Sequence, residues 1–234
     1  MRVFVLTGAG VSAESGLGTF RDTGGIWATF DPMKLATPEA FARDPVAVHA
    51  FYNARRRNLL AAAPNAAHRA LAELAGHVDL FLCTQNIDDL HERGGSPAVH
   101  HMHGELLKSL CRRCGAVADC RGDLSVLDHC PSCGHADALR PDVVWFGEIP
   151  YGLDAIEAAL AGADRFVAIG TSGAVYPAAG YVAMARDLGI PTTEINLAPS
   201  EVTDAFDDRR YGPATETVPV YVAALVAEAG RAKG

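Results

Sequence analysis

The chain has 234 residues and a formal net charge of -8 at pH 7. Its hydrophobic content of 49% and charged content of 21% are those of ordinary soluble globular proteins. A large nucleic-acid footprint needs a basic face, so the acidic balance argues against direct nucleic-acid binding. No apolar run approaches the ~18 residues of a membrane span and no targeting leader precedes the first strand, so we expect a cytoplasmic protein without a membrane segment.

The first twenty residues contain an apolar run that turns at once into a glycine-rich segment. Val3–Leu6 predicts a buried strand, and Gly8, Gly10 and Ala13 follow at the spacing G-x-G-x-x-G/A. Such a segment allows close backbone approach to a pyrophosphate and starts a helix whose N–H groups face the anion. Small residues after a strand also occur at plain packing turns, and the acidic residue expected about 20 positions later is missing. A glycine-punctuated loop over 18–27 stands there instead, and we expect it to close over a ligand.

Strand and helix patterns alternate through the rest of the chain. A polar residue followed by proline predicts helix starts at Pro38 and Pro45, and Pro64-Asn65 predicts a third. The predicted helices cover 45–60, 66–75 and 218–229, and the predicted apolar strands cover 78–83, 143–146, 166–169 and 193–197. This alternation predicts an α/β fold, a Rossmann-like doubly wound parallel sheet.

Small or polar residues follow several of the predicted strands. The segments are Thr84–Asp89, Gly170–Gly173 and Asn196-Leu197. Each could merely cap a helix, but ligands bind at the carboxyl ends of strands in open α/β sheets. Together with the glycine-rich segment after the first strand, these residues favour one shared ligand cleft.

Four of the six cysteines form two C-x2-C pairs, at Cys111, Cys114, Cys130 and Cys133. This spacing predicts a tetrahedral zinc site, and four protein ligands leave no open position, so one structural zinc ion is expected. Two disulfides are the alternative, but nothing in the sequence suggests secretion and cytosolic thiols stay reduced. We expect Cys120 to be a bystander and Cys83 to be a small core residue.

Three histidines, His100, His101 and His103, cluster just before the cysteine module. A histidine is more often a surface or core residue, but one followed by glycine at the junction between a sheet and a module is a candidate general base. Three further histidines have no such context and are predicted to lie on the surface: His68, His91 and His129.

Seven motifs together resemble the sirtuins, the NAD-dependent protein lysine deacylases. They are GAGVSAESG with TFR, TQNID at 84–88, HMHG at 101–104, the four cysteines, VVWFGE at 143–148, GTS at 170–172 and INL at 195–197, in the family's order. Gly18 replaces a proline of many members, which should loosen the loop. We expect no long terminal extensions, as in compact bacterial members.

The resemblance implies a reaction that transfers the acyl group of lysine to the ADP-ribose of NAD and releases nicotinamide, with His103 as general base. It implies that Trp145, Phe146, Gly147, Glu148, Val175 and Tyr176 bind the substrate backbone by strand pairing. The implied NAD-binding residues are Gly8, Ala9, Gly10, Ser12, Ala13, Glu14, Thr19, Phe20, Arg21, Trp27, Gln85, Asn86, Ile87, Asp88, Gly170, Thr171, Ser172, Asn196, Leu197, Ala198 and Ala214.

The segment Phe51–Arg55 is similar to the sirtuin branch that removes acidic acyl groups such as succinyl and malonyl. Tyr52 and Arg55 are three residues apart, so on a helix they share one face. Arginine pairs bidentately with a carboxylate and tyrosine adds a hydroxyl beside it. The alternative is a solvated basic face that continues through Arg56 and Arg57.

We expect a single catalytic domain over 1–234 that acts as a monomer on acyl-lysine proteins or peptides. The predicted large lobe covers about 1–35, 76–103 and 141–234, and the predicted small lobe joins a helical insertion of about 36–75 to a zinc module of about 104–140. Three other functions stay open: a zinc-ribbon nucleic-acid-binding regulator, a non-catalytic NAD-binding zinc regulator and a mono-ADP-ribosyltransferase. The acidic charge argues against the first, and a non-catalytic module has no use for His103.

Overall fold

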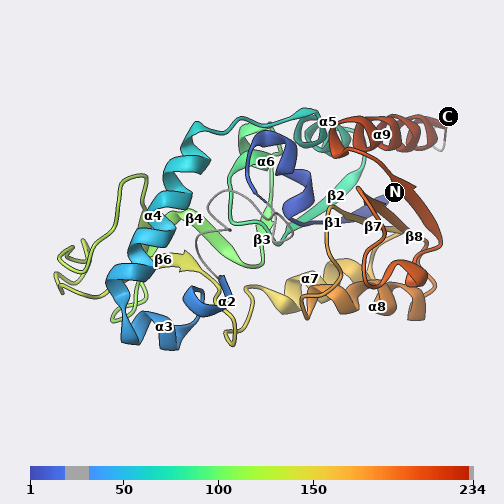
Figure 1. The fold of residues 1–234 in the computed structure, drawn as a ribbon. Helices are drawn as coiled ribbons and strands as arrows, with labels where there is room; N and C mark the ends of the chain where they lie inside the picture. Colours follow the sequence, from blue (N-terminus) through green and yellow to red (C-terminus); the bar gives the residue numbers. More distant parts are fainter. Residues whose placement is uncertain (19–31, 232–234) are drawn as a thin grey trace.

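The computed structural model describes residues 1–18 and 32–231. In this part of the chain, six parallel strands form a sheet with the order β3-β2-β1-β7-β8-β9 (Figure 1). These strands are β1 (Arg2–Thr7), β2 (Asp79–Thr84), β3 (His100–His101), β7 (Arg165–Ile169), β8 (Thr192–Asn196) and β9 (Asp208–Tyr211). Counted within this sheet, the order is 3-2-1-4-5-6, which is the order of dinucleotide-binding Rossmann folds.

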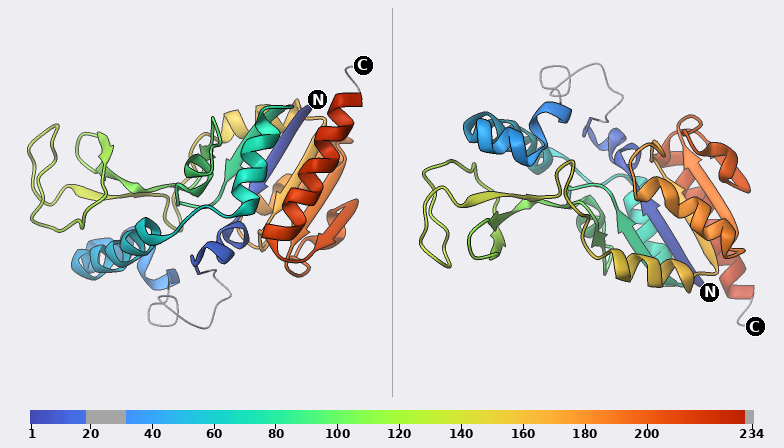
Figure 2. Two further views of the ribbon diagram at one scale, coloured as in Figure 1. Left: turned by 90° about the horizontal axis from the view of Figure 1, so that it is seen from above. Right: turned by 90° about the horizontal axis from the view of Figure 1, so that it is seen from below.

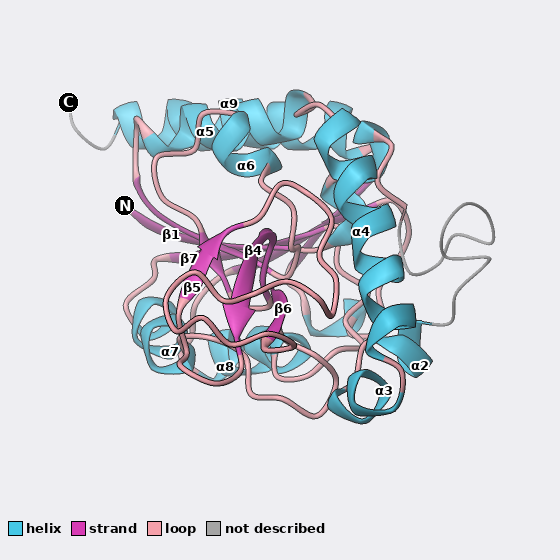
Figure 3. Cartoon of the chain, turned by 90° about the vertical axis from the view of Figure 1, so that its left-hand side faces the viewer, coloured by secondary structure: helices cyan, strands magenta, loops and turns pink. Residues whose placement is uncertain are grey.

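Helices cover both faces of this sheet (Figures 1 and 3). Successive residues of a strand point to opposite faces. Val3 and Val5 therefore pack under α5 (Ala66–Ala75) and α9 (Ala214–Arg231), while Phe4 and Leu6 pack against α7 (Leu153–Ala161) and α8 (Tyr181–Asp187). Burial on both faces explains why β1 is an uninterrupted apolar run. The predicted doubly wound α/β fold is confirmed.

A second, antiparallel sheet has the order β5-β4-β6. Its strands are β4 (Gly104–Cys111), β5 (Val117–Asp119) and β6 (Leu139–Val143), and the nearby helices are α2 (Pro32–Leu35), α3 (Pro38–Arg43) and α4 (Pro45–Ala61). We call these six elements the small lobe, and the six-stranded sheet with its covering helices the large lobe. The small lobe extends from one side of the large lobe (Figure 2).

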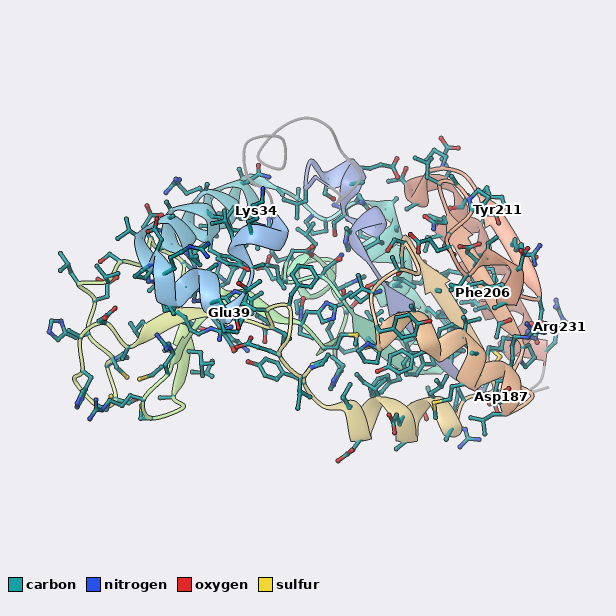
Figure 4. All side chains as sticks on the ribbon, turned by 60° about the horizontal axis from the view of Figure 1, so that its bottom comes forward. Lys34, Glu39, Asp187, Phe206, Tyr211 and Arg231 are labelled. Atoms are coloured by element: carbon teal, nitrogen blue, oxygen red, sulfur yellow. The ribbon has the colours of Figure 1, made fainter. Side chains whose placement is uncertain are left out.

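The side chains of the small lobe form their own core. Phe41, Phe51, Leu106 and Trp145 come from α3, α4, β4 and the segment after β6, and all four are buried together. Figure 4 shows the side chains of Lys34 and Glu39 at the small-lobe end of the molecule, and those of Tyr211 and Arg231 at the opposite end. Among the described residues, no helix is both long and apolar enough to cross a membrane.

The helix starts predicted from polar-proline pairs are confirmed. Thr37 Oγ1 accepts a hydrogen bond from the N–H of Ala40 at 3.0 Å, and Pro38 occupies the first turn of α3. Asp44 Oδ1 accepts from the N–H of Ala47 at 2.9 Å, and α4 begins at Pro45. Each side chain satisfies an N–H that the helix leaves unpaired, which fixes where the helix begins.

Two local predictions are wrong. Within the described residues 8–18, no α-helix follows β1, because two short 3-10 turns, η1 (Ala9–Val11) and η2 (Ala13–Ser15), end at Gly16 in the left-handed conformation with φ of 84°. No parallel strand covers 143–146, because β6 ends at Val143 and pairs antiparallel with β4. The chain turns after Val143, and Trp145 in this segment packs into the small-lobe core.

The predicted lobe boundaries also differ from the packing. Helix α5 was grouped with the small lobe, but it packs on α9 and on β1 and β2 of the large lobe. The predicted boundary at about 140 divides strand β6 between the two lobes, but the whole strand pairs with β4. The remaining short elements are α6 (Leu90–Arg93), η3 (Ala178–Gly180) and η4 (Thr203–Ala205).

Candidate active site

The loops that follow β1 and β7 touch at the point where the strand order reverses. The N–H of Gly8 donates to Ile169 O at 2.9 Å, and the N–H of Gly10 donates to Gly170 O at 2.8 Å. A Cβ on Gly10 would lie only 2.7 Å from Gly170 Cα, and Gly170 itself has a φ of +63°. The glycines of the two motifs are therefore required by the contact between their loops. This contact lies at the topological switch point, where such folds bind their ligands.

A cleft of about 630 Å³ opens between the two lobes. Many of the predicted site residues line it together. They are Ala9 and Ser12 after β1, Tyr52 and Arg55 on α4, Gln85, Asn86, Ile87 and Asp88 after β2, His103 after β3, Trp145, Phe146, Gly147 and Glu148 after β6, and Val175 and Tyr176 after β7. The structure thus brings the predicted base, part of the predicted NAD site and the predicted acyl site to one cavity.

Most of the other predicted NAD residues lie at neighbouring strand ends rather than in the cleft lining. They are Gly8, Gly10, Ala13, Glu14, Gly170, Thr171, Ser172, Asn196, Leu197, Ala198 and Ala214. Thr171 joins this group to the cleft, because its hydroxyl accepts from Gln85 Nε2 at 3.1 Å and its carbonyl accepts from Asn196 Nδ2 at 2.8 Å. Four predicted residues lie outside the described residues: Thr19, Phe20, Arg21 and Trp27.

Ser12, Asn86 and Asp88 form a buried hydrogen-bond network at the inner end of the cleft. Asn86 Nδ2 donates to Gly8 O at 3.1 Å and to Ser12 Oγ at 3.2 Å, and Ser12 Oγ donates to Asp88 Oδ2 at 3.0 Å. Burial raises the pKa of Asp88, and the hydrogen bonds from Leu90 N–H and Ser12 oppose this shift. The network fixes the orientation of the Asn86 amide and holds Asp88 in place.

His68 and His91 are buried behind this network, so their predicted surface positions are wrong; His129 is exposed as predicted. His68 Nδ1 accepts from the N–H of Asn65 at 3.2 Å, so the ring proton is on Nε2, which lies 3.4 Å from Ser12 Oγ. Burial lowers the pKa of His68 to about 4, so the ring is neutral. The signal in the sequence was its place three residues after the N-cap Asn65, where a capping box forms.

One hydrogen bond defines the protonation of His103. Its Nδ1 lies 2.9 Å from Gln85 O, and because a carbonyl only accepts, Nδ1 carries the proton. Nε2 is then the nitrogen that can accept a proton. Burial lowers the pKa of His103, and the bond to Gln85 opposes this shift only in part. His103 is therefore a neutral imidazole at neutral pH, as a general base must be.

Tyr52 and Arg55 share the face of α4 that lines the cleft, as predicted. The Tyr52 hydroxyl accepts a hydrogen bond from Trp145 Nε1 at 3.0 Å, and the Arg55 guanidinium carbon lies 5.6 Å from the centre of the Tyr52 ring. The alternative of a solvated basic face is wrong for Arg56, which is 1% exposed and donates to Leu106 O at 3.0 Å. Arg57 does lie on the surface, where it pairs with Asp123.

Glu148 organises the turn after β6. Its carboxylate accepts two hydrogen bonds from Arg140, at 2.6 and 2.9 Å, and one from the N–H of Trp145, at 2.8 Å. The Arg140 guanidinium in turn lies 3.3 Å from the centre of the Trp145 ring. This carboxylate therefore holds Trp145 beside Tyr52. A contact between Glu148 and a substrate stays a prediction.

The four cysteines of the C-x2-C pairs form one cluster, in which all Sγ atoms lie within 4.8 Å of one another. The Sγ atoms of Cys111 and Cys133, and those of Cys114 and Cys130, are 3.7 Å apart. A tetrahedral zinc ion with Zn–S bonds of about 2.3 Å places its sulfurs about 3.8 Å apart. A disulfide would bring two sulfurs to about 2 Å. The cluster therefore fits one zinc ion, and Cys83 and Cys120 lie outside it as predicted.

Comparison with known proteins gives the family. Residues 8–177 match the model of the Sir2 family. The NAD-dependent protein deacylase of Caulobacter vibrioides is 57% identical over 232 residues, which cover 97% of this chain and 98% of that protein. The protein of the same name from Escherichia coli strain K12 is 55% identical over 229 residues, or 96% of this chain and 82% of that protein. This chain belongs to the Sir2 family, and the resemblance to sirtuins is confirmed.

Solved structures agree with this assignment. A Sir2 homologue in complex with NAD has a TM-score of 0.88 and 39% identity, covering 100% of this chain and 91% of that one. A Sir2 protein bound to an acetylated peptide has a TM-score of 0.81 and 26% identity, covering 98% of this chain and 93% of that one.

Proposed function

We propose that this chain is an NAD-dependent protein lysine deacylase that removes acidic acyl groups such as succinyl as well as acetyl. The names of its relatives and the cleft between its lobes support the deacylase activity. The observation that carries the acidic specificity is the position of Tyr52 and Arg55, which line the same cleft as His103.

The residues around the glycine contact fit NAD. Ala9 and Ser12, the segment 85–88 and the ends of β7 and β8 would hold it. Bound NAD would supply an activated ribose that takes up the acyl group as nicotinamide leaves, and water would release the free lysine. Asn86 presents a fixed amide to this part of the cleft. His103 Nε2 accepts the proton of a ribose hydroxyl, and the bond from Nδ1 to Gln85 O keeps the ring in the orientation that presents Nε2.

The acyl end of the cleft offers two complementary groups to a carboxylate. Because the Tyr52 oxygen accepts from Trp145 Nε1, the hydroxyl proton remains to be donated to a ligand. Arg55 supplies a planar guanidinium on the same helical face, and guanidinium groups stay charged in proteins. A charge-assisted hydrogen bond from Arg55 and a neutral one from Tyr52 would select a carboxylate-bearing acyl group.

The test is mass spectrometry of matched acetyl- and succinyl-lysine peptides incubated with NAD. We expect free lysine and O-acyl-ADP-ribose from both peptides, with nicotinamide release that requires the acyl group. Nicotinamide release without an acylated peptide, or ADP-ribose attached to a protein, would contradict deacylation and favour ADP-ribosyl transfer.

The variant Arg55→Met tests the acidic specificity. Stranding the acyl carboxylate without its charged partner costs about 2 to 4 kcal/mol, so kcat/KM on the succinyl peptide should fall about 30- to 1000-fold. Tyr52→Phe should lower it less, because one neutral hydrogen bond contributes about 0.5 to 1.5 kcal/mol. Turnover of the acetyl peptide should change little in either variant.

Arg57→Met is the matched control, because Arg57 lies on the same helix but pairs with Asp123 at the surface. It should leave both substrates unaffected. Equal losses on the two peptides in Arg55→Met would mean that Arg55 only supports α4, and the acidic specificity would be abandoned.

A further inference from the structure

His101 lies two residues before the predicted base, at the end of β3, and its side chain is only 7% exposed. Each of its ring nitrogens has one partner at hydrogen-bond distance. Nε2 lies 2.6 Å from Glu92 Oε1 on α6, and Nδ1 lies 3.2 Å from the backbone oxygen of Asn86. His101 thus joins α6 to the turn that carries the central amide of the cleft.

Both partners of His101 can only accept. A carboxylate and a backbone carbonyl have no proton to donate, and a neutral imidazole carries a single N–H. The two hydrogen bonds can therefore exist together only when His101 is an imidazolium. His103 differs, because its Nδ1 bonds to a single carbonyl, that of Gln85, and its Nε2 is left to act as a base. Two histidines of one motif thus hold the successive carbonyls of Gln85 and Asn86 in different protonation states.

Holding the Asn86 carbonyl has a consequence for the cleft. The carbonyl belongs to the residue whose side chain donates to Gly8 O and Ser12 Oγ. His101 holds the backbone of Asn86, and Gly8 O and Ser12 Oγ hold its side chain. The turn after β2 therefore has little freedom to rotate. When the Nδ1–H bond is lost, one of these constraints disappears and a buried carbonyl loses its donor.

We propose that His101 is a positioning residue that acts as an imidazolium: it holds the Asn86 carbonyl, and its deprotonation loosens the NAD-binding turn and slows turnover. This rests on the proposed NAD-dependent function. It assigns the two histidines of the motif separate roles, one as the base and the other as a fixed cation behind the cleft.

The charges around His101 favour its protonated form. Burial disfavours the charge, but Glu92 and then Glu105 on β4 outweigh it, and the pKa of His101 is raised. The positive charge of His101 also lowers the pKa of the Asp88 carboxyl, against the larger effect of burial, which raises it. Lys108 pairs with Glu105 at 2.5 Å, and the neighbouring His91 is kept neutral by its burial.

The pKa shifts of His101 and His103 have opposite directions, and together they predict how turnover depends on pH. A raised pKa means that His101 keeps its proton to a higher pH than an ordinary histidine and loses it as the pH rises through its folded pKa. The pKa of His103 is lowered, so this residue is already unprotonated at neutral pH and gains a proton only in acid. As the pH rises from acid, turnover should increase because His103 loses its proton. At higher pH turnover should fall because His101 loses its proton.

The experiment compares pH profiles of kcat/KM for the wild type, Glu92→Gln and His101→Gln. Glu92→Gln removes the carboxylate that stabilises the imidazolium, so the alkaline limb should move down by about 1 pH unit or more while the acid limb stays. His101→Gln should lower kcat/KM at neutral pH about 10- to 100-fold and abolish this alkaline limb. His77→Gln is the control, because His77 is an exposed histidine that precedes β2 at the far end of the sheet. Its profile should match the wild type.

Two readouts do not depend on deacylation. Nitrogen NMR of the His101 ring at pH 7 should show both nitrogens protonated, and calorimetric NAD affinity should weaken as the ring deprotonates. A singly protonated ring at pH 7, or an alkaline limb that is unchanged in both variants, would overturn the proposal. If deacylation itself is absent, the NMR and NAD titrations still decide the role of His101. Because Glu92 is 40% exposed, Glu92→Gln keeps the test valid if His101→Gln fails to fold.

Discussion

At the scale of single residues, His103 carries the clearest chemical assignment. Its Nδ1 is fixed by Gln85 O, and the lowered pKa leaves Nε2 unprotonated at neutral pH. His103→Tyr removes this acceptor but keeps an aromatic ring at the cleft. We expect deacylation to fall at least about 10²- to 10⁴-fold, the contribution of general-base catalysis.

Steady-state turnover and metal content check this assignment together. The variant should keep its zinc and its melting temperature close to the wild type, because the His103 side chain lies at the cleft rather than in a core cluster. Near-normal turnover would rule out His103 as the base.

The histidines also show what a sequence can and cannot reveal about single residues. The motif around His103 predicts its role as a base and its place at the cleft, because a local pattern carries both predictions; the structure does place His103 at the cleft. His68 and His91 were misplaced on the surface, because their burial depends on residues far away in the chain. Their partners Ser12 and Thr7 lie 56 and 84 positions earlier. Only the folded packing of α5 and α6 against the β1 end brings these side chains together.

At the scale of elements, α4 connects the proposed acyl site to the zinc module. Its Tyr52 and Arg55 line the cleft, while the adjacent Asn53 faces the loop of the zinc module. Asn53 Nδ2 donates to Leu124 O at 2.8 Å, and its Oδ1 accepts from Leu124 N–H at 2.9 Å and from Arg56 Nη1 at 2.8 Å. One amide therefore anchors both the loop and a buried arginine.

Asn53→Ala should destabilise the protein and blunt its acyl selectivity. It leaves the buried Leu124 backbone groups and part of the Arg56 guanidinium unpaired, which costs about 1 to 3 kcal/mol. Looser anchoring of α4 should also lower the ratio of succinyl to acetyl kcat/KM. The measurements are urea unfolding and kinetics on the matched peptides.

The comparison variant is Arg57→Ala, which breaks an exposed ion pair to the same loop. Its two side chains are 60% and 57% exposed, and exposed pairs contribute about 0 to 1 kcal/mol. The loss in Asn53→Ala should therefore exceed the loss in Arg57→Ala. If the two variants are equally stable, Asn53 is not the anchor of the loop.

Elements differ in how well the sequence predicts them. Caps at Thr37 and Asp44 marked α3 and α4 correctly, because an N-cap and a following proline act within one turn. The sequence predicts an apolar strand over 143–146, and this prediction is wrong because an apolar run does not reveal what buries it. Here Phe146 N–H donates to Ala36 O at 2.9 Å, in the small lobe, so a turn forms where a strand was expected.

At the scale of the whole molecule, the strand order predicts where the ligand lies but not what closes the site. The alternating pattern correctly predicted a doubly wound sheet, and the order reverses between β1 and β7, where the glycine loops meet. The second wall of the cleft comes from the small lobe, through α4 and the turn after β6. Local patterns suggested the residues of this wall, whereas its position depends on the packing of α4 against β4 and β6.

Zinc should hold this second wall in place. Few apolar side chains are buried with the cysteines, namely Leu124, Ala138 and Leu139. Strand β5 has only three residues. So little apolar burial cannot order the segment 111–138, and most of its folding free energy must come from metal binding. Loss of zinc should then also disturb the proposed acyl site, because Asn53 is hydrogen-bonded to Leu124 within that segment.

Cys130→Ala tests this dependence, with Cys120→Ala as the matched control. Both cysteines are buried in the same module, but only Cys130 belongs to the four-sulfur cluster. Cys130→Ala should lose its metal, measured by elemental analysis, and should melt at a lower temperature with deacylation abolished. Cys120→Ala should keep one zinc per chain and most of its activity, since it loses only a small buried side chain. A metal-free Cys130→Ala with full activity would show that the small lobe is ordered by packing alone, and the structural role of zinc would be refuted.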